Sequence, residues 1–141
     1  MITLLVLNYM VAVVIYFVKD SIVKFVSLPS HIAGISIFPF SFIKKSHKDN
    51  SEYVERILVH ERIHFHQQRK WVLIGGLVGF LSWYFAYVFL LPAVYNPFRW
   101  KWEYLAFRDG DKYEHDHIVK VLSSGTYGFL KERLHKIPND G

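Results

Sequence analysis

The clearest chemical signal in this 141-residue chain is the run His60-Glu61-Arg62-Ile63-His64. Residues four apart on a helix lie about 40° apart around its axis, so the two histidines can bind one zinc ion. Glu61 is turned by about 100° from His60, which lets it reach a water beside the metal rather than the metal itself. The pattern predicts a Zn²⁺ metallopeptidase that hydrolyses peptide bonds of peptide or protein substrates with zinc-activated water and Glu61 as general base.

A catalytic zinc needs a third protein ligand and one open position. We expect Glu103 in that role, because it is the only acidic residue of a predicted helix over 97–107 and stands among aromatic residues, where an unpaired carboxylate is costly. An ion pair with Arg99 or Lys101 is the alternative explanation for this residue. The other candidate ligands are Asp109, Asp111, Glu114, His115, Asp116 and His117. The run 114–117 ranks second, because helical residues spaced by one or two do not converge.

Three further residues are expected to support the site. Gln67 stands about one turn after His64 and can brace a ligand by hydrogen bonding. Tyr113 or His117 can stabilise the oxyanion that forms during hydrolysis.

The motif residues resemble a known group of proteins. His60-Glu61-x-x-His64-x-x-Gln67, then Asn96-Pro97-Phe98, then Glu103-Tyr104-x-Ala106-Phe107 are similar to small, uncharacterised, zincin-like metallopeptidases of bacterial and phage genomes, over about residues 31–108. The resemblance implies a short β segment before the motif helix and a hydrophobic connection after it. Those relatives often carry Glu-x-Glu-Ala in the last motif, whereas Leu105 takes the second position here, which leaves Glu103 as the acid that the resemblance offers.

The elements that must position these residues can be read from the pattern. Residues 35–38 and 40–43 alternate around Pro39 and predict two short strands or one bent edge strand. Ser51 is the expected N-cap of the motif helix, which should end near residue 70. Asn96 and Pro97 should start the next helix, which should stop near 109–110. Residues 111–122 predict an amphipathic helix and residues 127–136 a short last one.

The first 18 residues are almost continuously apolar and predict a membrane anchor over residues 1–20. As a helix they would reach about 27 Å, close to the bilayer core thickness. No basic residue precedes them, which argues against a cleaved signal peptide. Lys19 and Lys24 follow, so we expect the N-terminus outside and the metal site near the cytoplasmic face. A buried core helix is the alternative.

The second apolar block, residues 71–96, raises a topological conflict. A straight membrane-spanning helix there would place His60 and Glu103 on opposite sides of a bilayer. The segment can instead form a helical hairpin that dips into the membrane and bends between Gly79 and Pro92, or a hairpin packed on the N-terminal helix. In the remaining case it spans, and Glu103 is not a ligand. We expect the hairpin, because it keeps the site together.

Together these features predict a mainly α fold with a short β hairpin: an N-terminal transmembrane or anchor helix, then a zincin-like helical core over residues 21–141 with a hydrophobic helical hairpin. The net charge of +5 favours a lipid bilayer over nucleic acid as partner, since the basic residues flank the apolar blocks. The absence of cysteine excludes thiolate zinc ligands. The alternative function is a non-catalytic small membrane protein, a scaffold or phage-encoded host-membrane factor, with a structural or relic metal site.

Overall fold

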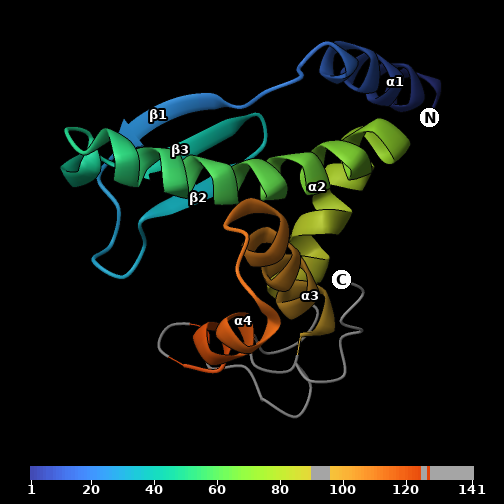
Figure 1. Cartoon of the computed structure of the whole chain (residues 1–141). Coiled ribbons are helices and arrows are strands. Elements are labelled where there is room, and N and C mark those ends of the chain that lie inside the picture. Colours follow the sequence, from blue (N-terminus) through green and yellow to red (C-terminus); the bar gives the residue numbers. More distant parts are fainter. Residues whose placement is uncertain (90–95, 125–126, 128–141) are drawn as a thin grey trace.

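The computed structural model describes residues 1–89, 96–124 and 127 of the chain, and within them the fold is mainly α with a small mixed sheet (Figure 1). The predicted helix 127–136 lies outside the described residues except for Tyr127. The elements in chain order are α1 (Ile2–Tyr16), β1 (Ile22–Val26), β2 (Gly34–Ile37), β3 (Phe40–Lys44), the 3₁₀ turn η1 (Lys45–His47), α2 (Ser51–Tyr84), the π-helical turn η2 (Phe85–Phe89), α3 (Pro97–Leu105), the π-helical turn η4 (Ala106–Gly110) and α4 (His115–Leu122).

The sheet has the strand order β1-β3-β2. Strands β2 and β3 pair antiparallel, with Ile35 opposite Phe42, which confirms the short hairpin predicted around Pro39. Strand β1 pairs parallel with β3, with Ile22 opposite Phe40. Strand β1 was not predicted, because a parallel pair is not joined by a tight turn and so leaves no local turn signal in the sequence.

Helix α2 carries the His60–His64 motif and is longer than predicted. It begins at Ser51, and its N-cap is Asn50, whose Oδ1 accepts a hydrogen bond of 3.1 Å from the Tyr53 amide. The predicted cap, Ser51, was therefore wrong by one residue. The helix also does not end near residue 70, because the apolar residues that follow the motif continue it to Tyr84.

A kink at Gly76 divides α2 and redirects the chain (Figure 1). Gly76 has φ 57° and ψ −135°, a conformation that favours glycine. A Cβ at this position would also collide with Asn8 of α1, so the glycine allows both the kink and the close approach of α1. The kink lies before the Gly79–Pro92 interval in which the bend was expected.

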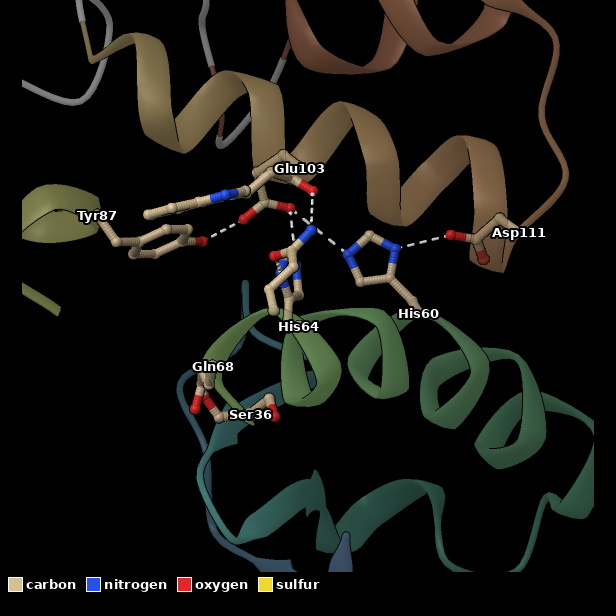
Figure 2. A network of polar contacts seen from close by, with 9 residues as sticks. Ser36, His60, His64, Gln68, Tyr87, Glu103 and Asp111 are labelled. Atoms are coloured by element: carbon tan, nitrogen blue, oxygen red, sulfur yellow. Dashed lines mark hydrogen bonds and ion pairs between the residues drawn. The ribbon is translucent and has the colours of Figure 1, made fainter. Parts of the chain in front are cut away.

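Helix α2 lies between the sheet and α3 (Figures 1 and 2). On the sheet side the fully buried Gln68 donates to the Ser36 carbonyl at 2.9 Å and accepts from the Phe38 amide at 2.7 Å. On the other side η4 comes so close that a Cβ at Gly110 would lie 3.2 Å from the Cα of His60. Both neighbours of α2 are thus fixed beside the motif.

After the kink the chain packs against α3, which brings the two halves of the predicted site together. Trp83 stacks on Trp102 with ring centroids 5.0 Å apart, and on Tyr87 with centroids 4.8 Å apart. Residues 90–95, between η2 and α3, lie outside the described part. The Asn96 side chain caps α3 through the amides of Phe98 and Arg99, as predicted.

Helix α1 packs on α2 but buries none of its own residues. Val11 and Ile15 of α1 contribute partly buried side chains to the cluster around Phe65 and Val72. Helix α1 is 15 residues long, shorter than the 18 residues predicted. Among the helices that the structure describes, none combines the length and the apolar character that a membrane span needs.

Candidate metal centre

Two histidines of α2 and one glutamate of α3 converge on one point (Figure 2). The Nε2 atoms of His60 and His64 lie 3.5 Å and 3.4 Å from Oε2 of Glu103. One ligand atom from each of the three residues lies within 4.8 Å of the others. The structure therefore assembles a group that can hold a metal ion from the three residues predicted to do so.

The two distances from the histidine nitrogens to the Glu103 oxygen fit a tetrahedral metal site. Zinc binds histidine nitrogen and carboxylate oxygen at about 2.0–2.2 Å, and in a tetrahedron two ligand atoms are then about 3.3–3.5 Å apart. The two nitrogen–oxygen distances of 3.5 Å and 3.4 Å match this spacing. Direct charge-assisted hydrogen bonds are shorter, at about 2.7–2.9 Å.

The Glu103 carboxylate is deeply buried and only half satisfied. Its side chain is 4% exposed, and Oε2 accepts no hydrogen bond. The other oxygen, Oε1, accepts a hydrogen bond from the Tyr87 hydroxyl (Figure 2). In the described part of the chain neither Arg99 nor Lys101 makes an ion pair with Glu103, so that alternative explanation finds no support. A cation held between Oε2 and the imidazoles would satisfy the buried oxygen.

In each histidine, the ring nitrogen that faces away from Glu103, Nδ1, has a hydrogen-bond partner. His60 Nδ1 donates to Asp111 Oδ2 at 2.7 Å, and His64 Nδ1 donates to Gln67 Oε1 at 3.0 Å. The Gln67 amide is itself oriented, since its Nε2 donates to the Trp102 carbonyl at 3.2 Å. Both Nδ1 atoms thus carry a proton, so a metal would bind at Nε2 once the proton there has left. Gln67 thus contacts His64 as expected, and its role in bracing a ligand stays a prediction.

The charges at the site are coupled. Burial lowers the pKa of His60, but the hydrogen bond with Asp111 and the nearby Glu103 carboxylate outweigh it and raise the pKa to about 10. Burial likewise opposes the charge on His64, and the neighbouring Glu103 carboxylate raises its pKa above the usual value. For Glu103, burial favours the neutral acid, but the positive His64 and contacts with both imidazoles hold the pKa well below its usual range. Glu103 is therefore an anion, as a metal ligand must be.

Glu61 lies beside the three candidate ligands, and all four residues line the same cavity. The cavity has a volume of about 520 Å³ and is lined by Glu61, His60, His64 and Glu103 among others. Burial raises the pKa of Glu61, while the two histidines partly offset that rise. Gly34 of β2 packs over this residue, since a Cβ there would lie 3.3 Å from Glu61 Cγ. A buried carboxylate with a raised pKa is suited to accept a proton near neutral pH.

Of the two residues predicted to stabilise an oxyanion, only one lines the cavity. Tyr113 lines the cavity and stacks on Phe107, with ring centroids 5.8 Å apart. His117 is exposed on α4 and touches the outer ring of Tyr113, with centroids 4.5 Å apart, but does not line the cavity. Tyr113 thus stays a candidate for contact with a substrate, and His117 reaches the site only through Tyr113.

The remaining candidate ligands lie elsewhere, with one exception. Asp109 pairs with Arg108, and His115 Nδ1 contacts the Tyr104 hydroxyl at 2.8 Å. Glu114 and Asp116 are exposed at the start of α4. Asp111 is the exception, because it binds the site through His60 rather than as a ligand. Asp111 was predicted only as a candidate ligand, although its place directly after Gly110, where a helix was expected to stop, is typical of a turn that could bring its carboxylate back to α2.

Sequence reasoning gave no role to Tyr87 and Tyr127. Tyr87 binds Glu103 from η2, and Tyr127 lines the cavity. Burial raises the pKa of Tyr127, and the Glu103 carboxylate adds to the rise. Neither residue has a spacing that links it to the motif, so the sequence held no signal for them. Comparisons of the chain with protein-family models, with curated proteins and with solved structures find no match.

Proposed function

We propose that the protein is a membrane-associated zinc metallopeptidase, with His60, His64 and Glu103 as ligands and Glu61 as general base. The observation that carries the proposal is the spacing of the ligand atoms, at 3.5 Å and 3.4 Å from one buried carboxylate oxygen. Zinc fits better than magnesium or calcium, which prefer sites built of oxygen atoms alone. A bound zinc ion would lower the pKa of a water molecule and polarise the carbonyl of the bond to be cleaved.

The chain's own residues supply the proton transfers. Glu61 faces the cavity beside both histidines, so its carboxylate can take a proton from the attacking water and pass it to the leaving amine. Its raised pKa brings it closer to neutral pH, where both steps are efficient. Asp111 and Gln67 hold the imidazoles in the orientation that the ligands need. The cavity volume of about 520 Å³ lies within the range of ligand sites and accommodates a short peptide segment.

Two measurements on the full chain test the proposal. The purified protein should contain one zinc ion per chain, and this zinc should be lost in His60→Ala and His64→Ala but kept in His66→Ala, which removes an exposed histidine of the same helix. Glu61→Gln should keep the zinc and lose cleavage of an internally quenched peptide library. Glu55→Gln, an exposed residue of α2, is the matched control and should keep both. A zinc-free wild type contradicts the proposal. If the protein contains zinc but its biological effect is unchanged in Glu61→Gln, the alternative of a non-catalytic membrane protein is favoured instead.

The membrane part of the proposal is supported by exposed apolar side chains. On α1, Leu4 is 63% exposed and Val14 is 63% exposed, and on the distal part of α2, Ile74 is 79% exposed. Apolar surface of this extent on two packed helices suits contact with lipid. The N-terminus outside and the metal site near the cytoplasmic face stay predictions. Because the chain has no cysteine, Thr3→Cys and Ser51→Cys can test them with a thiol reagent that does not cross membranes. Labelling from outside is expected for Thr3→Cys alone.

A further inference from the structure

Unsatisfied polar atoms gather at the cavity. In the described part of the chain, five buried side-chain nitrogen or oxygen atoms have no hydrogen-bond partner, and four of their residues line the cavity: Ser36, Trp83, Arg99 and Glu103. Buried polar atoms without a partner are costly and call for an explanation. The proposed metal explains Glu103 but does not explain Arg99, which is a cation and cannot be a ligand.

Arg99 has a fixed place but no anionic partner among the described residues. It stands on α3 one turn before Glu103, so both residues share a face of the helix. Its guanidinium carbon lies 5.2 Å from the centroid of the Tyr87 ring, a cation–π contact that positions the group without neutralising it. Its Nε is buried and unpaired. The Glu103 carboxylate is engaged with the two histidines instead (Figure 2).

The separation of Arg99 and Glu103 along α3 suits a peptide substrate. Tyr87 connects the two, because its hydroxyl binds Glu103 while its ring carries the guanidinium of Arg99. Four residues of helix rise by about 6 Å. Two residues of an extended peptide cover about 7 Å. A peptide whose cleaved bond lies at the metal can therefore place a group on Arg99 within about two residues.

We propose that Arg99 binds a carboxylate of the substrate, so that the preferred substrates are peptides with a carboxylate within about two residues of the cleaved bond. This inference rests on the proposed peptidase function. The planar guanidinium fork matches a carboxylate with two parallel hydrogen bonds. Three carboxylates, Glu61, Glu103 and Asp111, line the same cavity and repel a dianionic phosphate more strongly than a carboxylate. The carboxylate can be an acidic side chain or the C-terminus of the peptide.

Matched peptides test the proposal on the zinc-loaded full chain. One pair differs by Glu against Gln near the cleaved bond, and a second pair by a free against an amidated C-terminus. The wild type should cleave the charged member of one pair with a kcat/KM about 10- to 100-fold higher than that of the neutral member. This ratio corresponds to the typical contribution of a hydrogen bond to a charged group. The pair that shows the effect identifies the source of the carboxylate. Arg99→Gln should remove the preference and keep the zinc, and Lys101→Gln, an exposed cation of the same helix, should change neither.

The outcomes separate this inference from the proposed function. An unchanged preference in Arg99→Gln, or no preference in the wild type, overturns the role of Arg99 and leaves the peptidase intact. Arg99→Lys keeps the charge but not the fork, so it should show a reduced preference, and it decides the question if Arg99→Gln does not fold.

If the wild type cleaves nothing, binding decides instead. Saturation-transfer NMR can compare the binding of N-acetylglycine, which has a carboxylate, with that of N-acetylglycinamide, which has none, and it requires no catalysis. Carboxylate binding that is lost in Arg99→Gln supports the inference even though the peptidase proposal fails, and binding that is equal in both proteins overturns it.

Discussion

Zinc uptake at neutral pH should displace a proton from His60. Burial lowers the pKa of His60, but the Asp111 hydrogen bond and the nearby Glu103 carboxylate outweigh it and raise the pKa to about 10. In the metal-free protein at pH 7, His60 with a charged imidazole then outnumbers His60 with a neutral one by about a thousandfold. Removing the proton from His60 therefore costs about 4 kcal/mol. The pKa of His64 is raised as well, mainly by Glu103 acting against burial, which adds to the protons released.

The sign of the pH dependence follows from the same shift. Because the folded pKa of His60 lies above the ordinary value of 6.5, its proton stabilises the metal-free fold fully below pH 6.5. That contribution is lost as the pH rises from 6.5 to about 10. Zinc competes with the proton, so the affinity for zinc should rise by up to about tenfold per pH unit for each proton displaced.

Calorimetric titration with zinc measures the displaced protons. Titrations at pH 7 in two weakly zinc-binding buffers of different ionisation enthalpy should give different heats, and their difference should correspond to at least one proton per zinc ion. Asp111→Asn removes a hydrogen bond that raises the pKa of His60 and should lower this number. Asp109→Asn, an exposed neighbour, should leave it unchanged. Equal heats in both buffers, with an affinity independent of pH between 6 and 8, would refute the reasoning, because His60 would then be neutral.

Three further changes have defined outcomes. Gln67→Ala removes the hydrogen bond that orients His64, so zinc affinity in a competition assay with a chromophoric chelator should fall about 10-fold, and an unchanged affinity would show that Gln67 does not brace the ligand. Gln68→Ala leaves the Phe38 amide unpaired and removes one hydrogen bond from the Ser36 carbonyl, so it should lower the free energy of unfolding in urea by about 2–4 kcal/mol; an unchanged value would show that Gln68 does not fix the hairpin to α2. The double variant Leu5→Glu/Val14→Glu should abolish flotation with liposomes containing anionic lipid, whereas Ser51→Glu should not; equal flotation would argue against α1 as the membrane contact.

The local parts of the site could be predicted from the sequence. The spacing of His60 and His64 fixes their relative position on a helix, and Asn96-Pro97 marks where α3 must start. The choice of Glu103 followed from one acid among aromatic residues, and the structure brings it to both imidazoles. Each of these predictions follows from residues close together in the sequence, through helix geometry, helix capping or the cost of burying a charge.

The tertiary parts could not be predicted in the same way. Strand β1 pairs with a segment well separated from it in sequence, and the kink at Gly76 depends on the approach of Asn8 from another helix. Asp111 and Tyr87 reach the site only because η4 and η2 pack on either end of it. Such contacts arise from packing between elements, which the spacing of residues along the chain does not encode.

X-ray absorption spectroscopy at the zinc edge tests the central claim most directly. The wild-type protein should bind one zinc ion with two histidine nitrogens and one carboxylate oxygen from the protein at about 2.0–2.2 Å. Glu103→Gln should lose the carboxylate contribution and weaken binding, because the buried oxygen that faces both imidazoles at 3.5 Å and 3.4 Å would be replaced. A wild type without zinc, or a spectrum that Glu103→Gln leaves unchanged, would contradict the site built from His60, His64 and Glu103.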